Sequence, residues 1–197
     1  MSITAKDVKD LREKSGAGMM DCKKALTETN GDLAAATIWL REKGMASAEK
    51  RAGKVASEGA VTSYIHMGGK MGVLAEINCE TDFVAKGEQF QNLCKDICLQ
   101  ICSAAPRWIT REEVPADVIA AEKQIYISQM TDSGKPENIL EKIADGKMSK
   151  FYEENCLMEQ GFVKEPKTSI EDMLKTLSGN VGEKIEVRRF ERFVLGE

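Results

Sequence analysis

Residues 72–86 read GVLAEINCETDFVAK, and this stretch contains a strand followed by the start of a helix. Apolar residues occupy every second position from Val73 to Cys79, which predicts a β-strand with one buried face. Thr81 and Asp82 then supply the N-cap signal of a helix, and Phe83 follows at once. A Phe at a helix start either packs inward or stands exposed as an anchor for a partner's pocket. The pattern alone favours the buried alternative and leaves the exposed one open.

Two further segments predict partners for this strand. Residues 60–66 (AVTSYIH) are rich in β-branched and aromatic side chains and predict a strand. Gly68-Gly69-Lys70 forms a turn between this strand and the strand that begins near Val73, so the two strands make a hairpin. Residues 185–195 predict a last strand, whose alternation changes parity as a β-bulge near Arg188-Arg189 would cause. We therefore predict an α+β fold in which helices cover one three-stranded antiparallel sheet.

The first 44 residues predict a compact unit of three helices. The expected helices run from a cap at Ser2-Ile3-Thr4 to Ser15, from Met19 or Met20 to Thr29, and from the cap Asp32 to Gly44. Gly16-Ala17-Gly18 separates the first two helices. The polar residues that follow Gly44 indicate a linker, with a domain boundary between residues 50 and 56.

Helical patterns also fill most of the region between the hairpin and the last strand. They cover about Phe83–Ala104, a helical hairpin at about 117–155 whose arms are separated by TDSGKP (131–136), and Ser169–Leu177. The helical hairpin is typical of a projecting coiled-coil arm and equally of two core helices. We divide the chain into a three-helix domain (1–50), a linker (51–59) and a core domain (60–197).

The composition argues against several classes of function, although EKRAGK (49–54) and the arginines at 188, 189 and 192 leave local basic patches open. The net charge is −4, whereas broad phosphate binding needs a surplus of Lys and Arg on one face. No apolar run approaches the ~20 residues that a membrane span needs, and the N-terminal sequence MSITAKDVKD has no feature of a signal or transit segment. We therefore expect a cytoplasmic protein that binds neither membranes nor nucleic acid directly.

The residue types that carry metals or catalysis form no recognisable site. Cys94, Cys98 and Cys102 share one helical face, but zinc needs four ligands, and the one histidine, His66, lies in a strand. We interpret these thiols as a reduced, buried core stripe. No glycine-rich segment ends in the GK[ST] of a phosphate loop. We expect no metal, no cofactor and no enzymatic activity; an enzyme that uses Cys79 or the cysteine stripe is an alternative.

Segments along nearly the whole chain resemble the family of bacterial translation elongation factor Ts. They are LREKSGAGMMDCKKAL (11–26) with GDLAAATIWLREKG (31–44), RAGKVASEGAV (51–61), NCETDFVAKGEQF (78–90) and SGKPENILEKIADGKMSKFYEENCLMEQGFVK (133–164). The resemblance implies a guanine-nucleotide exchange factor that binds elongation factor Tu in its GDP-bound and nucleotide-free states. It would promote GDP release, so that GTP rebinds during translation elongation.

The same resemblance implies roles for individual residues. The N-terminal unit corresponds to the family's ubiquitin-associated-like domain, which docks on Tu, and Met19 and Met20 are candidate contacts there. Four residues match the family's TDFV motif: Thr81, Asp82, Phe83 and Val84. In the family this motif reaches between Tu helices and disturbs the Mg²⁺ site. Phe83 would then be an exposed wedge.

Longer members of the family carry two related sheet subdomains, and here one is missing near residues 95–110. A lone three-stranded sheet leaves an apolar face to cover, so we predict a homodimer that pairs through its sheets. The three-helix unit by itself is also compatible with a ubiquitin-type adaptor, a different class of function that gives residues 60–197 no role.

Overall fold

The computed structural model describes residues 3–129 and 137–197, and the chain divides into two compact units. The first unit is Met1–Leu99 together with Glu171–Glu197, and the second is Gln100–Ile170. The sequence-based division at residues 50 and 59 stays a prediction.

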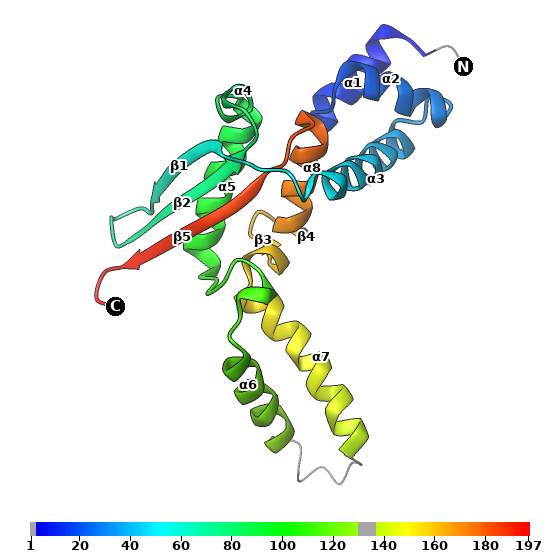
Figure 1. Ribbon diagram of the computed structural model, residues 1–197. Coiled ribbons are helices and arrows are strands. Elements are labelled where there is room, and N and C mark those ends of the chain that lie inside the picture. Colours follow the sequence, from blue (N-terminus) through cyan, green and yellow to red (C-terminus); the bar gives the residue numbers. More distant parts are fainter. Residues whose placement is uncertain (1–2, 130–136) are drawn as a thin grey trace. The chain divides into compact units, whose positions relative to one another are not determined.

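Helices α1 (Ala5–Ser15), α2 (Met19–Glu28) and α3 (Leu33–Arg51) open the first unit (Figure 1). Thr4 caps α1 in a capping box, because its side chain accepts from the Asp7 amide while the Asp7 carboxylate accepts from the Thr4 amide. The apolar sides of the three helices meet in one cluster, formed by Val8, Leu11, Ala17, Cys22, Ala25, Leu26, Ala36 and Leu40. This cluster explains why three short helices hold together.

Two glycines predicted to end or follow helices lie inside them instead. Helix α3 continues past Gly44 to Arg51, and α8 (Ile170–Val181) continues past Gly179. The predicted ends at Gly44 and Leu177 are therefore wrong. A Cβ added at Gly179 would overlap the backbone of Gly44, so the two helices cross with their main chains in contact. Gly179 permits this close crossing, whereas a Cβ at Gly44 would make only an ordinary contact of 3.6 Å with the Gly179 Cα.

An antiparallel sheet in the first unit has the strand order β1 (Glu58–Ile65), β2 (Met71–Cys79), β5 (Glu186–Val194), which confirms the predicted three strands. Along the β2–β5 pair, Glu76 lies opposite Arg189 but Ile77 lies opposite Val187. Arg188 is therefore an extra residue in β5, and the predicted bulge is confirmed.

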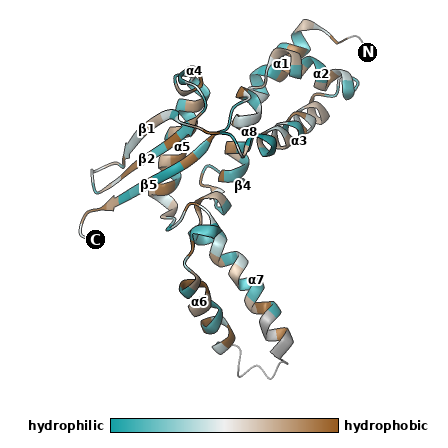
Figure 2. Cartoon of the chain, in the orientation of Figure 1, coloured by the Kyte–Doolittle hydropathy of each residue, from teal (hydrophilic) through white to brown (hydrophobic). Residues whose placement is uncertain are grey.

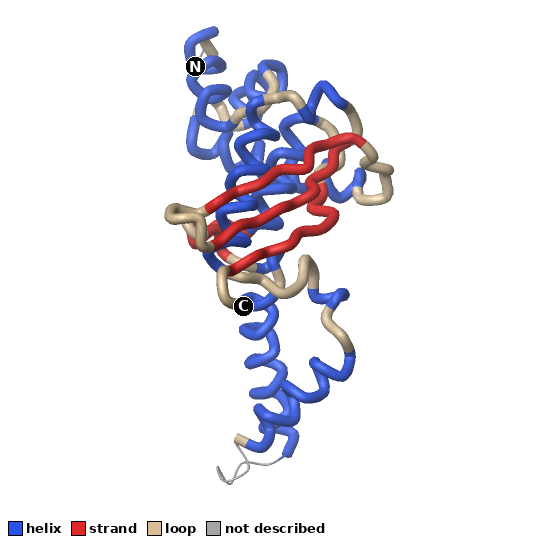
Figure 3. Tube along the Cα trace, turned by 90° about the vertical axis from the view of Figure 1, so that its left-hand side faces the viewer, coloured by secondary structure: helices blue, strands red, loops and turns tan. Residues whose placement is uncertain are grey.

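One face of this sheet is buried against α5 (Glu88–Ala104), which packs behind the strands (Figures 1 and 3). Val73, Ala75 and Ile77 are buried, as the alternation predicted. The part of α5 in the same unit carries buried apolar residues and thiols: Phe90, Leu93, Cys94, Ile97 and Cys98. Ile101 and Cys102, which belong to the second unit, are buried as well. The cysteine stripe is therefore part of the core.

The helix predicted over Phe83–Ala104 is two helices. The first is the single turn α4 (Asp82–Ala85), and α5 follows after Lys86-Gly87. The Gly87 amide turns back to donate to the Val84 carbonyl at 2.9 Å. This tight turn ends α4 and lets α5 start in a new direction.

The second unit contains helices α6 (Ala116–Ser128) and α7 (Glu137–Asn155), which pack against each other. Lys123 and Asp145 form an ion pair of 3.1 Å between them, and the Lys147 ammonium lies over the Tyr126 ring. These helices agree with the hairpin expected at about 117–155; its description as a coiled-coil arm stays a prediction. The predicted break at 131–136 lies outside the described residues. Hydrophobic residues are frequent on α6, yet none of its described side chains is fully buried (Figure 2).

Short elements complete the second unit. They are the 3₁₀ turns Arg111–Glu113 and Leu157–Glu159 and a small antiparallel pair, β3 (Gly161–Phe162) with β4 (Glu165–Ser169). The β3–β4 pair was not predicted, because strands this short show no alternation. The buried Gln100 joins this pair, since its Oε1 accepts from the Val163 amide at 2.9 Å.

Candidate functional site

The segment Thr81–Val84 begins α4 at the point where the chain leaves β2. Thr81 has an extended backbone, and its hydroxyl accepts a hydrogen bond from the Val84 amide at 3.4 Å, the geometry of an N-cap. Ala85 is buried under the turn, whereas Phe83 is 84% exposed. Within this turn Ala85 is buried and Val84 is half-buried, so these two residues face the protein. Phe83 therefore points to solvent, the alternative that the residues alone did not favour.

A carboxylate from a distant part of the chain holds this turn. Glu183 lies between α8 and β5, and its Oε2 accepts hydrogen bonds from the backbone amides of Glu80 (3.1 Å) and Thr81 (3.0 Å). Its Oε1 accepts from the Thr81 hydroxyl at 2.6 Å. Hydrogen bonds to an ionised acceptor are shorter and stronger than neutral ones. The start of α4 is therefore fixed both at its backbone and at its capping side chain.

A second carboxylate crosses in the opposite direction. Glu80 Oε1 accepts from the Lys184 amide at 2.7 Å and from Arg51 Nη1 at 3.2 Å. The hydrogen bond from the Lys184 amide, followed by the bond and charge of Arg51, lowers the pKa of Glu80. We call the two crossed carboxylates, Glu183 and Glu80, the carboxylate clamp. It also ties the end of α3, through Arg51, to the end of β2.

Asp82 is exposed beside Phe83 and forms an ion pair of 2.7 Å with Lys86. The hydrogen bond and charge of Lys86 lower the pKa of Asp82, and Asp82 in turn raises the pKa of Lys86. Asp82 is therefore ionised at neutral pH. Exposed pairs of this kind add little to stability, so Asp82 can exchange Lys86 for another partner at small cost.

Met19 and Met20 begin α2 and are 48% and 75% exposed. The N-cap of α2 is Gly18, and within the described residues no side chain caps this helix end. The hydrogen bonds of Thr81 and Asp82 described above run to Glu183 and Lys86 rather than to α2. The two candidate surfaces therefore lie on different elements, although Gln89 at the start of α5 donates to the Gly16 carbonyl at 3.1 Å.

The candidate thiols are core groups. All six cysteines are buried, and burial raises the pKa of Cys94 to about 12 and that of Cys156 to about 11. Burial also raises the pKa of Cys79, followed by the charge of Glu183. Protonated, inaccessible thiols are poor nucleophiles and poor metal ligands. His66 Nδ1 lies 3.1 Å from the Tyr64 hydroxyl, which gives it a structural partner.

The described residues contain neither a metal-binding cluster nor a membrane-spanning helix. Across 3–129 and 137–197, no three His, Cys, Asp or Glu side chains are grouped closely enough to hold a metal ion. In the same ranges no helix has both the length and the apolar character needed to cross a membrane.

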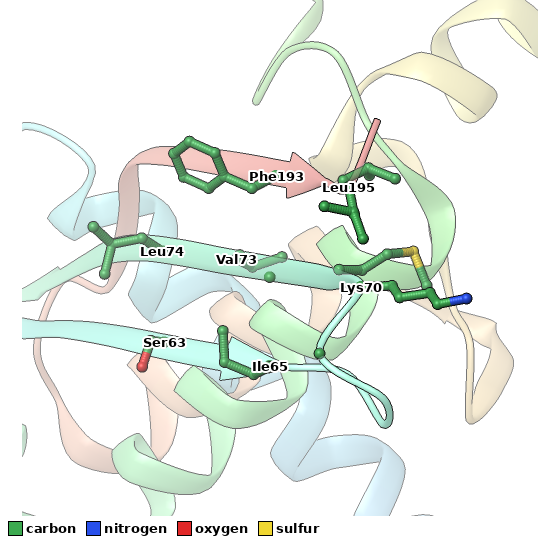
Figure 4. A pocket seen from close by; sticks show the side chains of 11 residues that line it. Ser63, Ile65, Lys70, Val73, Leu74, Phe193 and Leu195 are labelled. Atoms are coloured by element: carbon green, nitrogen blue, oxygen red, sulfur yellow. The ribbon is translucent and has the colours of Figure 1, made fainter. Parts of the chain in front are cut away.

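The outer face of the sheet exposes apolar side chains. Val61, Ile65, Leu74 and Phe193 are 47–66% exposed. Figure 4 shows Ile65, Leu74 and Phe193 around a hollow of about 510 Å³ on the sheet. Gly72 lies between Ile65 and Phe193 in the register, and a Cβ there would lie 2.9 Å from Ile65 Cδ1. The missing side chain lets Ile65 lean across β2.

Glu183 was missed by the sequence analysis. Its carboxylate lies in a loop, and nothing in the surrounding residues marks it. The available signal is strand register: Asn78 pairs with Glu186, and continuing that antiparallel register places Thr81 opposite Glu183. Sequence reasoning that paired the two predicted strands in this register would have found the contact.

Comparison with known proteins points to a single family. The family model described as "Elongation factor TS" matches residues 3–197. A protein named Elongation factor Ts from Anaeromyxobacter sp. (strain K) is 62% identical over 195 residues, which cover 99% of this chain and 89% of that protein. Proteins of the same name from Geobacter sulfurreducens (57% identical; 100% and 91% covered) and Moorella thermoacetica (54% identical; 99% and 96% covered) are also similar.

Proposed function

The chain belongs to the elongation factor Ts family, and we propose that it is a guanine-nucleotide exchange factor for elongation factor Tu in the cytoplasm. It binds Tu in the GDP-bound and nucleotide-free states and speeds GDP release, so that GTP rebinds during translation elongation. The observation that carries this proposal is Phe83, which stands exposed on a turn whose backbone is fixed by Glu183. It acts by binding and performs no covalent chemistry.

The proposed mechanism is a mechanical and electrostatic disturbance of the partner. GDP is held in such GTPases largely by phosphate–Mg²⁺ electrostatics in a preorganised loop. Phe83 inserts between helices of Tu and shifts the loop that holds Mg²⁺ and phosphate. The ionised Asp82 exchanges Lys86 for a position near the same site, where its charge competes with the phosphate.

A fixed turn suits this role, because flexible segments lose conformational entropy when they bind. The cap at Thr81 and the carboxylate clamp order the turn before Tu arrives. Coupling between the two ligands of Tu is reciprocal: this protein weakens GDP binding by the same factor by which GDP weakens binding of this protein. Nucleotide rebinding therefore releases it.

Met19 and Met20 belong to a second, docking contact in this proposal. Methionine side chains are flexible and polarizable and adapt to irregular surfaces. They hold the complex together while Phe83 acts.

A second copy of the chain covers the outer face of the sheet. Its exposed apolar side chains centre on the hollow between Ile65, Leu74 and Phe193. A two-fold pairing lets the same patch meet itself, which is the commonest arrangement in homodimers. We expect sedimentation to give a dimer mass and Leu74→Glu to give a monomer that still folds. A wild-type mass that stays monomeric at high concentration would contradict this pairing.

The decisive experiment measures release of labelled GDP from Tu with and without this protein. We expect release to accelerate in proportion to the amount added until it saturates. A pull-down with Tu and with ubiquitin separates this function from that of a ubiquitin-type adaptor. If folded protein leaves GDP release unchanged, the proposed function is wrong.

A further inference from the structure

We infer that Glu183 is a positioning residue for nucleotide exchange: it orients Phe83 through the backbone and hydroxyl of Thr81. This inference rests on the proposed function, and its experiment separates the two. Glu183 does not need to touch Tu. Its effect passes through hydrogen bonds inside this chain to a side chain that does.

Glu183 binds two backbone amides at the end of β2. The β1–β2 pairing ends at Cys79, so the amides of Glu80 and Thr81 lie beyond the last strand pair. Both donate to Glu183 Oε2, at 3.1 and 3.0 Å. Glu183 therefore replaces a strand partner at the two residues that set the direction of α4.

The Thr81 hydroxyl has two hydrogen-bond partners. It donates to Glu183 Oε1 at 2.6 Å and accepts from the Val84 amide at 3.4 Å. A hydroxyl rotates to suit its partners, and donation to Glu183 leaves its lone pairs directed at Val84. Without the carboxylate the hydroxyl is free to rotate, the cap weakens, and Phe83 samples more orientations.

The loop that carries Glu183 is itself held by a hydrogen bond to the end of β2. Glu80 Oε1 accepts from the Lys184 amide at 2.7 Å, so residues 80–81 and 183–184 bind each other in both directions. Within the described residues no Lys or Arg lies within ion-pair distance of Glu183. Its charge therefore strengthens the hydrogen bonds that it accepts from Glu80 and Thr81. A function in orienting the turn fits this arrangement better than a surface ion pair does.

The test compares Glu183→Gln and Glu183→Ala with the wild-type chain. The matched control is Glu171→Gln, which removes an exposed carboxylate on α8 whose ion pair is with Lys175. For each we would measure the maximal rate of labelled-GDP release from Tu and the concentration that gives half of it. We expect Glu183→Ala to lower the maximal rate about tenfold, with Glu183→Gln in between, because charged hydrogen bonds exceed neutral ones. The half-saturating concentration should change less than about twofold.

A double variant tests the route through Phe83. If Glu183 acts through that side chain, Glu183→Gln combined with Phe83→Ala should be no slower than Phe83→Ala alone. In the unbound protein, hydrogen exchange at the Glu80 and Thr81 amides should accelerate in Glu183→Gln and stay unchanged in Glu171→Gln.

The outcomes separate the two claims. A wild-type maximal rate in a folded Glu183→Gln variant, or a fully additive loss in the double variant, would overturn the positioning role. If the wild-type protein itself fails to accelerate GDP release, the proposed function fails, and amide exchange still decides whether Glu183 orders the turn. If Glu183→Ala does not fold, the Gln variant carries the test.

Discussion

The two candidate partner surfaces of the first unit are built in opposite ways. At α4 the exposed residue is a Phe, and the turn beneath it is capped by Thr81 and held by Glu183. At the start of α2 the exposed residues are Met19 and Met20, and the N-cap is Gly18, which has no side chain to offer.

The difference indicates a division of labour. A rigid aromatic on a fixed turn can transmit force into a partner, because little of its binding energy is lost in ordering itself. Methionines on an uncapped helix start can adjust to a partner's shape but cannot push against it. We therefore expect variants at α4 to change the maximal exchange rate and variants at α2 to change affinity.

The largest expected effect concerns the crossing of α3 and α8 in the unit that carries both surfaces. Gly179→Ala places a Cβ against the Gly44 backbone, where α3 and α8 cross. Because main chain cannot move aside as a side chain can, we expect the free energy of unfolding to fall by about 3 kcal/mol. Urea denaturation measures this. Gly146→Ala, where an added Cβ meets open space, is the control and should not destabilise. A stable Gly179→Ala variant would show that the crossing is not tight.

The next effect concerns the wedge. Phe83→Ala should lower the maximal rate of GDP release about 30-fold, which corresponds to the roughly 2 kcal/mol typical of a central aromatic contact. Its thermal midpoint should not change, because the ring is exposed in the unbound protein. Val55→Ala removes another exposed apolar side chain and serves as the control. A Phe83→Ala variant that exchanges normally would break the distinction between the two surfaces.

A smaller effect is expected at α2. Met20→Ala should raise the concentration for half-maximal exchange about fivefold and leave the maximal rate unchanged, since about 1 kcal/mol of docking contact is lost. Met67→Ala removes another exposed methionine, at the β1–β2 turn, as the control. A reduced maximal rate in Met20→Ala would mean that this surface acts on the nucleotide site as well.

No effect is expected from thiol chemistry. Burial raises the pKa of Cys94 to about 12, so at pH 8 this thiol is protonated and shielded, and its reactive thiolate increases only as the pH rises toward that value. Treatment of the native protein with iodoacetamide should leave GDP release unchanged, and mass spectrometry should find Cys94 unmodified. Loss of exchange on alkylation would favour the alternative of a thiol-dependent enzyme.

The sheet could be predicted from the sequence because its signals are local. Alternation along β2 placed Val73, Ala75 and Ile77 on the buried face, and a change of parity in β5 revealed the bulge at Arg188. The continuation of α3 past Gly44 could not be predicted, for the opposite reason. Locally Gly44 is typical of a helix end, and the α8 backbone that it contacts at Gly179 is distant in the sequence.

The candidate site divides in the same way. The cap at Thr81 and the position of Phe83 were visible in consecutive residues, and the match to a known motif favoured exposure of the ring. Glu183 was out of reach, because its contact with Thr81 joins residues 102 positions apart. The pairing of β2 with β5 has to be known before that contact can be inferred.

The clamp has a consequence for how the protein is made. A ribosome synthesises residues 78–90 long before it reaches Glu183, and at about 5–20 residues per second the intervening 102 positions take roughly 5–20 s. During that interval Thr81–Val84 follow a two-stranded hairpin, which is marginally stable by itself. The motif is thus synthesised early but becomes ordered only late. A partial chain presents Phe83 without the hydrogen bonds of Glu183 that orient it.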